Sequence, residues 1–180
     1  MRKFISLFIL LSILSLLSGC GTTAKMAVEN YLNEYRSLSN NVTKNMNDIV
    51  DRENLENEDR KKYIDIFKKQ YKNLEYEIVD EAYDGDEAII KAKIKVYDLY
   101  KIQNNASIYL ANHMDEFTNK NGEYDLNKYI KYKLDKMYNT NDKIDYTIDF
   151  YVVNTSDGWT VSSLSNADLE KIHGIYNYEV

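Results

Sequence analysis

The chain has 180 residues, a formal net charge of −6, one cysteine and no proline. That length suits one ordinary domain, whose core is large enough to fold without disulfides or structural metals. The acidic balance argues against a nucleic-acid partner and against a polybasic grip on anionic lipid.

The N-terminus has the pattern of an export signal. Arg2 and Lys3 precede a nearly all-apolar run over 4–17, which is shorter than the roughly 20 residues that a membrane-spanning helix needs. The run leads into Leu17, Ser18, Gly19 and Cys20, which resemble the lipobox of bacterial lipoproteins. The resemblance implies a signal peptide over 1–19 and a diacylglyceryl group on the sulfur of Cys20. The alternative is an uncleaved anchor helix.

Lipidation would also account for the single thiol, since a leftover cysteine in a secreted protein otherwise suggests intermolecular pairing. Two acyl chains, such as palmitate, are enough for stable anchoring, whereas one chain binds only marginally. Cleavage would remove Arg2 and Lys3 and make the protein more acidic by two charges. The predicted organisation is a lipidated tether over 20–25 and a single α+β domain over 26–180, on the outer face of the cytoplasmic membrane.

Helical spacing of apolar residues dominates the first part of this domain. One helix is predicted over about 23–38 and a second over 57–73, with a short helical piece around 45–51 and a polar, loose segment over 39–43 between them. The two stripes consist of Ala27, Tyr31, Tyr35 and Leu38, and of Tyr63, Phe67, Tyr71 and Leu74.

The segment from Asp86 to Tyr100 alternates apolar and polar residues, which predicts a long strand with one buried face. A preceding strand over 75–83 would form a hairpin with it. A three-residue loop, 83–85, would pair Ile78 with Ile90 and keep both in the core. A two-residue Asp-Gly turn would place Ile78 opposite Lys91, on the wet face.

The remaining elements repeat this order. Helices are predicted over 105–117 and 125–138, then a strand over 144–154. A loop over 155–158 would pair Val152 with Val161, and a last short helix would end at Gly174. The predicted fold class is therefore α+β, a curved antiparallel sheet packed on the N-terminal and inserted helices in a cone-like shape.

Two stretches carry a wider resemblance. The run from Tyr146 to Tyr176 contains an Asp-Gly-Trp turn followed by Leu-Ser-Asn-Ala-Asp-Leu-Glu-Lys-Ile-His-Gly-Ile-Tyr, and the domain opens with Ala-Val-Glu-Asn-Tyr-Leu over 27–32. These stretches resemble small bacterial lipoproteins of unknown function with a nuclear-transport-factor-2-like, or cystatin-like, domain. The resemblance covers most of 24–176, implies the cone fold and brings no functional residues.

Candidate chemistry is sparse. Asp98 is in phase with the buried face of the long strand, so it is either a cavity carboxylate acting as acid or base, or a solvated strand end. His113, near Asp115 and Glu116, lacks the spaced ligand set of a zinc site, so no metal or other cofactor is expected. His173, near a helix end, is expected to complement the helix dipole.

Trp159 follows the last turn in phase with the core face, which predicts a largely buried ring near Tyr31 or Tyr35. The rival interpretation is an exposed ring that stacks on a sugar or a partner. The sequence favours a lipid-anchored extracytoplasmic binding or interaction module for an unknown protein or small molecule, with no catalytic residue assigned. The alternatives are a cavity enzyme using Asp98, and a scaffold or immunity protein that occupies a partner.

Overall fold

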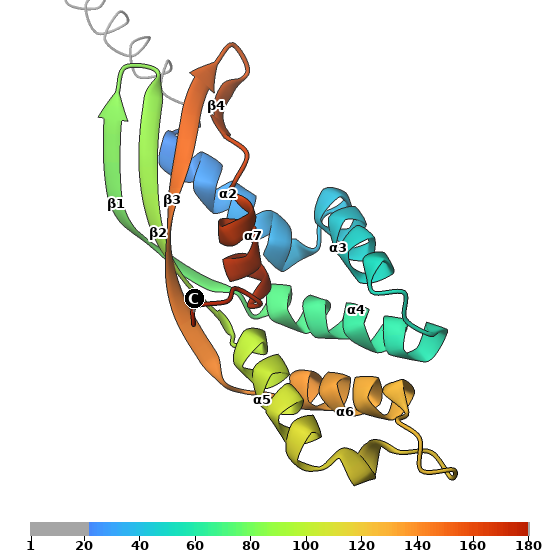
Figure 1. Cartoon of the computed structure of the whole chain (residues 1–180). Helices are drawn as coiled ribbons and strands as arrows, with labels where there is room; N and C mark the ends of the chain where they lie inside the picture. The colour runs from blue at the N-terminus through green and yellow to red at the C-terminus, as the bar shows by residue number, and fades with distance from the viewer. Residues whose placement is uncertain (1–21, 180) are drawn as a thin grey trace, which may run out of the picture.

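The computed structural model describes residues 22–179. Four antiparallel strands form one open sheet in the order β1 (Glu75–Asp84), β2 (Glu87–Tyr97), β3 (Lys143–Thr155) and β4 (Gly158–Val161). Three helices, α2 (Ala24–Ser37), α4 (Asn57–Lys72) and α7 (Asn166–His173), pack against it (Figure 1). The predicted α+β class, a curved antiparallel sheet packed on helices, is confirmed.

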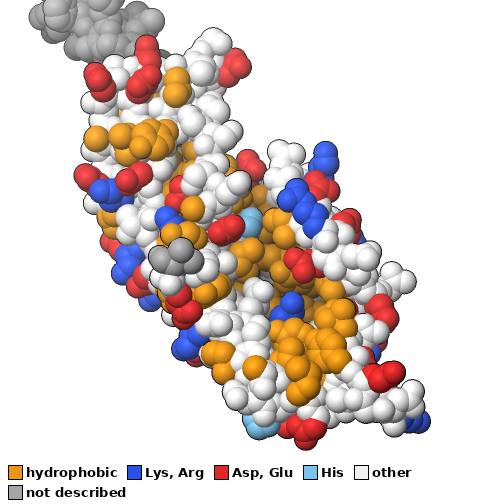
Figure 2. All heavy atoms as spheres, in the orientation of Figure 1, with side chains coloured by type: hydrophobic (Ala, Val, Ile, Leu, Met, Phe, Trp, Pro, Cys, Tyr) orange, Lys and Arg blue, Asp and Glu red, His pale blue; other side chains and the backbone are white. Residues whose placement is uncertain are grey.

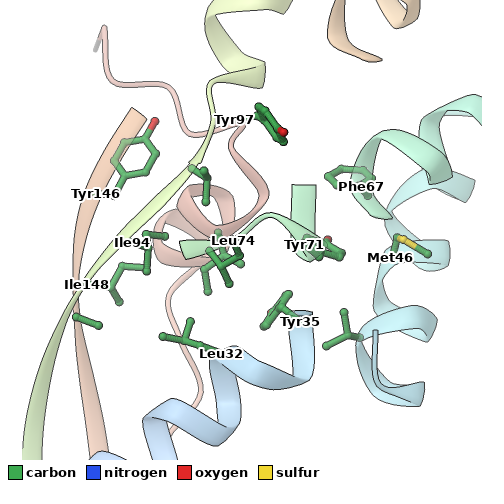
Figure 3. Close-up of a cluster of buried hydrophobic side chains, with 14 of the residues drawn as sticks. Leu32, Tyr35, Met46, Phe67, Tyr71, Leu74, Ile94, Tyr97, Tyr146 and Ile148 are labelled. Atoms are coloured by element: carbon green, nitrogen blue, oxygen red, sulfur yellow. The ribbon is translucent and has the colours of Figure 1, made fainter. Parts of the chain in front are cut away.

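The alternating pattern of β2 produces the core as predicted. Ala88, Ile90, Ala92, Ile94 and Val96 are all buried, and the facing residues Tyr146, Ile148, Phe150 and Val152 of β3 are buried beside them. Leu32 and Tyr35 of α2 and Tyr71 of α4 point into the same space as Ile94 and Ile148 (Figure 3). Removing this apolar sheet face from water is favourable, so it contributes to the stability of the fold.

The β1–β2 register differs from the prediction. Ile78 pairs with Ala92 rather than Ile90, and the turn is the two residues Gly85 and Asp86. A shift in register between Ile78 and Asp80 leaves Val79 as an extra residue in β1. The bulge returns the Ile78 side chain to the core face, so the two-residue turn does not expose it to solvent. The pairing of Val152 with Val161 is confirmed, although the strands continue to Thr155 and Gly158.

Two helix boundaries also differ. The segment predicted as a loose linker belongs to α3 (Asn40–Arg52), because the Ser39 side chain caps it and Val42, Met46 and Val50 bury one stripe. β2 ends at Tyr97 rather than Tyr100, because Asp98 caps α5 (Leu99–Asn112). A 3₁₀ turn, η1 (Met114–Phe117), then leads to α6 (Leu126–Asn139), and α5 and α6 pair beyond one end of the sheet (Figure 1).

A buried glutamine joins three elements at the centre. Gln70 of α4 accepts the backbone N–H of Tyr97 (2.9 Å) and donates to the carbonyls of Tyr97 (3.3 Å) and Ile172 (3.4 Å). Gly174 closes over this amide with φ +73°, and a Cβ at that position would overlap Gln70 and the Tyr97 carbonyl. Only glycine therefore fits the end of α7.

Within residues 22–179, no helix is long and apolar enough to cross a bilayer.

Candidate functional site

Asp98 is buried, with 5% of its surface exposed, and it acts as a helix cap. Its Oδ1 accepts the backbone N–H of Lys101 (3.0 Å), and its Oδ2 accepts the hydroxyl of Tyr178 (3.0 Å). The carboxylate is thus neither an isolated acid nor a solvated strand end. Hydrogen bonds offset the cost of its burial.

The C-terminal segment covers this cap. Burial, together with the hydrogen bond to Asp98, raises the pKa of Tyr178 to about 12. Tyr146 packs edge-on against Tyr176, and burial followed by the charge of Asp98 raises its pKa as well. The Tyr146 hydroxyl has no hydrogen-bond partner among the described residues. These contacts hold residues 176–179 against the start of α5, which is a structural task.

His113 lies at the end of α5, at the opposite end of the molecule from the sheet turns. Its ring stacks on Tyr109 with the centroids 4.1 Å apart, and its Nδ1 is 3.5 Å from Oε1 of Glu116. Nearly half of the side chain is exposed. No group of three or more histidine, cysteine or acidic side chains between residues 22 and 179 is arranged to hold a metal ion.

His173 is buried among aromatic rings, so the prediction that it complements the helix dipole is wrong. Its Nδ1 is 3.0 Å from the hydroxyl of Tyr71, and the rings of Tyr35 and Phe67 pack against it. Burial lowers the pKa of His173 to about 4. The imidazole is therefore neutral near pH 7 and provides no charge to the dipole.

A hollow of about 450 Å³ opens between α3 and α7, which both pack on α4. The residues that line it occur at positions i, i+3, i+4 and i+7 of each helix, which share one helix face. The lining residues are Asn45, Asp48, Ile49 and Arg52 of α3, and Asn166, Leu169, Glu170 and His173 of α7, with Tyr35 and Ile175. Figure 2 shows this face hollowed, with hydrophobic side chains and a histidine inside.

The charges around the hollow are not neutralised by protein partners. Asp48 and Arg52 are four residues apart in the favourable order, yet no ion pair joins either of them, or Glu170, to another described residue. The walls thus present carboxylates and a guanidinium above the neutral imidazole of His173. A volume in the range of small-molecule sites, about 300–1,000 Å³, makes this hollow the candidate functional site.

Sequence reasoning did not find this hollow. Polar residues at helical spacing over 45–52 and 166–173 were a signal that each helix has a polar face. No local pattern states that the two faces meet, since α4 brings them together. Asp98, the residue that the sequence singled out, does not line the hollow.

Trp159 is half-buried and packs against the edge of the hydrophobic core, on the side that the sequence predicts. Its ring meets Tyr83 edge-on with the centroids 5.9 Å apart, and it lines a shallow hollow with Tyr31 in the middle of α2. The predicted neighbour Tyr31 is present, but β4 has only four residues and lies at the sheet edge. No strand beyond β4 covers the indole within residues 22–179.

The lipobox residues Leu17, Ser18, Gly19 and Cys20, and the signal peptide over 1–19, lie outside the described residues. The described chain begins at Thr22, which lies at the tip of the sheet beside the β3–β4 turn. A Cβ built at Gly158 would lie 2.9 Å from Oγ1 of Thr22. Comparisons with protein families, with curated proteins and with solved structures find no match to this chain.

Proposed function

We propose that this protein is a lipid-anchored binding module on the outer face of the cytoplasmic membrane, and that it binds a small polar ligand in the hollow between α3 and α7. The anchor is proposed from the lipobox ending at Cys20. The resemblance of 24–176 to small lipoproteins with a nuclear-transport-factor-2-like domain is consistent with this proposal. The observation that carries the binding function is the set of unpaired charges around a hollow with His173 in its lining.

The chemistry of the walls favours a ligand with charges of both signs, such as an amino acid or a short peptide. Asp48 and Glu170 suit an ammonium group, and Arg52 suits a carboxylate, which a guanidinium binds through two parallel hydrogen bonds. The imidazole of His173 can donate or accept one further hydrogen bond in its neutral form. The hydroxyl that contacts this imidazole belongs to Tyr71, which does not line the hollow and whose pKa is raised by burial, so it is a poor nucleophile and binding is the better-supported role.

Ligand binding is tested with free amino acids and dipeptides as probes. Binding to the native state should raise the melting temperature as the probe concentration rises, and should shift the ring resonances of His173 in NMR spectra. Arg52→Ala and Glu170→Gln should remove both effects, whereas Lys44→Ala, an exposed α3 residue outside the hollow, should keep them. Shifts that persist in Arg52→Ala, or no response to any probe, would refute this site.

The anchor is tested separately. Cys20→Ser should move the protein from the membrane fraction to the released fraction and abolish labelling with palmitate, because no other thiol exists in the chain. A Cys20→Ser protein that stays membrane-bound or still incorporates palmitate would refute the lipid anchor. Neither outcome depends on the hollow, so the two parts of the proposal can fail independently.

A further inference from the structure

The solvent-facing side of the sheet, opposite the helices, has two chemically different halves. One half is a ladder of cross-strand ion pairs, in which Lys91 lies 3.8 Å from Asp149 and Lys93 lies 3.0 Å from Asp145. Opposite charges on neighbouring strands stabilise the strand pair, and these side chains remain exposed to solvent. This half therefore needs no partner.

The other half, toward the β1–β2 and β3–β4 turns, is apolar. Ala82 pairs with Ile89, and Ile89 pairs with Tyr151, so the three side chains form one row across β1, β2 and β3. Val153 lies on the same face, two residues further along β3, and the exposed fractions of Ile89, Tyr151 and Val153 are 40%, 61% and 38%. These four residues, the sheet-end patch, line a groove of about 390 Å³. Adjoining exposed apolar side chains, unlike single ones, indicate an interaction site.

Carboxylates surround the sheet-end patch. Asp84 and Glu87 line the groove, and Asp80 lies next to it opposite Lys91. None of the three acids forms an ion pair with another residue between 22 and 179, and the nearby Lys91 already faces Asp149. Figure 2 shows hydrophobic side chains bordered by acidic ones over this end of the sheet. The patch thus combines an apolar centre with a net negative rim.

This charge pattern selects among the occupants. A second copy related by a two-fold axis would place the same carboxylates face to face, which is unfavourable. The patch lies at the end of the sheet where Thr22 begins the described chain, so under the proposed lipid anchor it would lie near the bilayer. Anionic phospholipid would nevertheless be repelled by the same rim.

We propose that the sheet-end patch docks a basic polypeptide, with an aliphatic or aromatic side chain of the partner in the groove and its lysine or arginine residues on Asp84 and Glu87. The apolar centre supplies affinity, and the charged rim supplies orientation and partner selection. This surface lies on the face of the sheet opposite the hollow between α3 and α7. The two sites can therefore be tested apart.

The test uses the protein from residue 20 onward and a fluorescent peptide of alternating lysine and leucine as the probe, with a glutamate–leucine peptide as its counterpart. The lysine peptide should bind, more weakly as salt rises, and NMR shifts should centre on Ile89 and Tyr151. Tyr151→Ser and Glu87→Lys should each weaken binding about tenfold or more. Thr147→Ala, on the same face of β3 in the charged half, should leave it unchanged.

Four outcomes would overturn the proposal. Equal binding of both peptides, or binding that Tyr151→Ser and Glu87→Lys leave unchanged, would exclude the patch as a basic-peptide site. Dimerisation in sedimentation experiments that Tyr151→Ser abolishes would assign the patch to a second copy. Binding to phosphatidylglycerol vesicles that Tyr151→Ser abolishes would assign it to the membrane. Because Tyr151 is well exposed, its replacement should leave the melting temperature close to that of the wild type.

Discussion

Mild acid should destabilise this fold through His173. In the folded protein this imidazole is buried against Tyr35, Phe67 and Tyr71, and burial holds its pKa near 4. In the unfolded chain it takes up a proton near the ordinary pKa of 6.5. Protons therefore bind the unfolded state first, and stability falls as the pH drops from about 6.5 toward about 4.

The magnitude follows from the two pKa values. The gap between 6.5 and about 4 corresponds to about 3 kcal/mol of unfolding free energy, all of which is present above the unfolded pKa. Between about pH 7.5 and about pH 5, roughly 2 kcal/mol of it should be lost. A domain of this kind has a total stability of about 5–15 kcal/mol, so the effect is large enough to measure.

Urea unfolding at the two pH values measures this loss directly. His173→Asn should flatten the pH dependence by roughly 2 kcal/mol, because it removes the ionisable group and leaves the other titrating residues unchanged. His113→Asn is the matched control for the substitution itself, since that imidazole is about half exposed and lies outside the core. NMR titration of the wild-type ring provides an independent measurement. A His173 ring that titrates near pH 6.5, or an equal pH dependence in His173→Asn, would refute the argument.

Three further predictions concern the fold. Gly174→Ala should lower the unfolding free energy by about 2–5 kcal/mol in urea titrations, because a Cβ at this positive φ overlaps the Tyr97 carbonyl. Gly122→Ala, at a positive φ but in open space, should lower it by only about 1–2 kcal/mol, and equal losses would contradict this account. Asp98→Ala should lower the unfolding free energy by about 1–2 kcal/mol and lower the pKa of Tyr178 in a spectroscopic titration. Asp98→Asn keeps a capping side chain and should lower the unfolding free energy by less, so the reverse order would count against the capping role. Trp159→Ala should lower the unfolding free energy by roughly 2 kcal/mol, which is below the range for a fully buried tryptophan. Acrylamide should partly quench the fluorescence of the wild-type protein, and fluorescence that acrylamide does not quench would contradict half-burial.

The sequence alone was sufficient for the fold class and for much of the core. The alternation in β2 assigned every second residue from Ala88 to Val96 to the buried face, because a strand exposes successive residues to opposite sides. The helical stripe with Phe67 and Tyr71 was equally readable, since residues three and four apart share a helix face. The pairing of Val152 with Val161 followed from the requirement that both side chains lie on the core face of the sheet.

Where the predictions were wrong, a contact distant in sequence or an irregularity decided the outcome. The bulge at Val79 changed the β1–β2 register, and a bulge has no composition signal as clear as that of a turn. Asp98 became a cap because the chain turns into α5, and its second oxygen is satisfied by Tyr178, 80 residues away. Local periodicity cannot predict that partner.

The candidate sites belong wholly to the tertiary structure. Periodicity placed His173 at a helix end, but only the packing of α7 on α4 brings it against Tyr71 and makes it a neutral group in the lining of a hollow. The polar faces of α3 and α7 meet because both helices pack on α4. The sheet-end patch exists because the strand register aligns Ala82, Ile89 and Tyr151, which are scattered over 70 residues of the chain. Sequence patterns report which face a residue occupies, whereas long-range packing decides which faces meet.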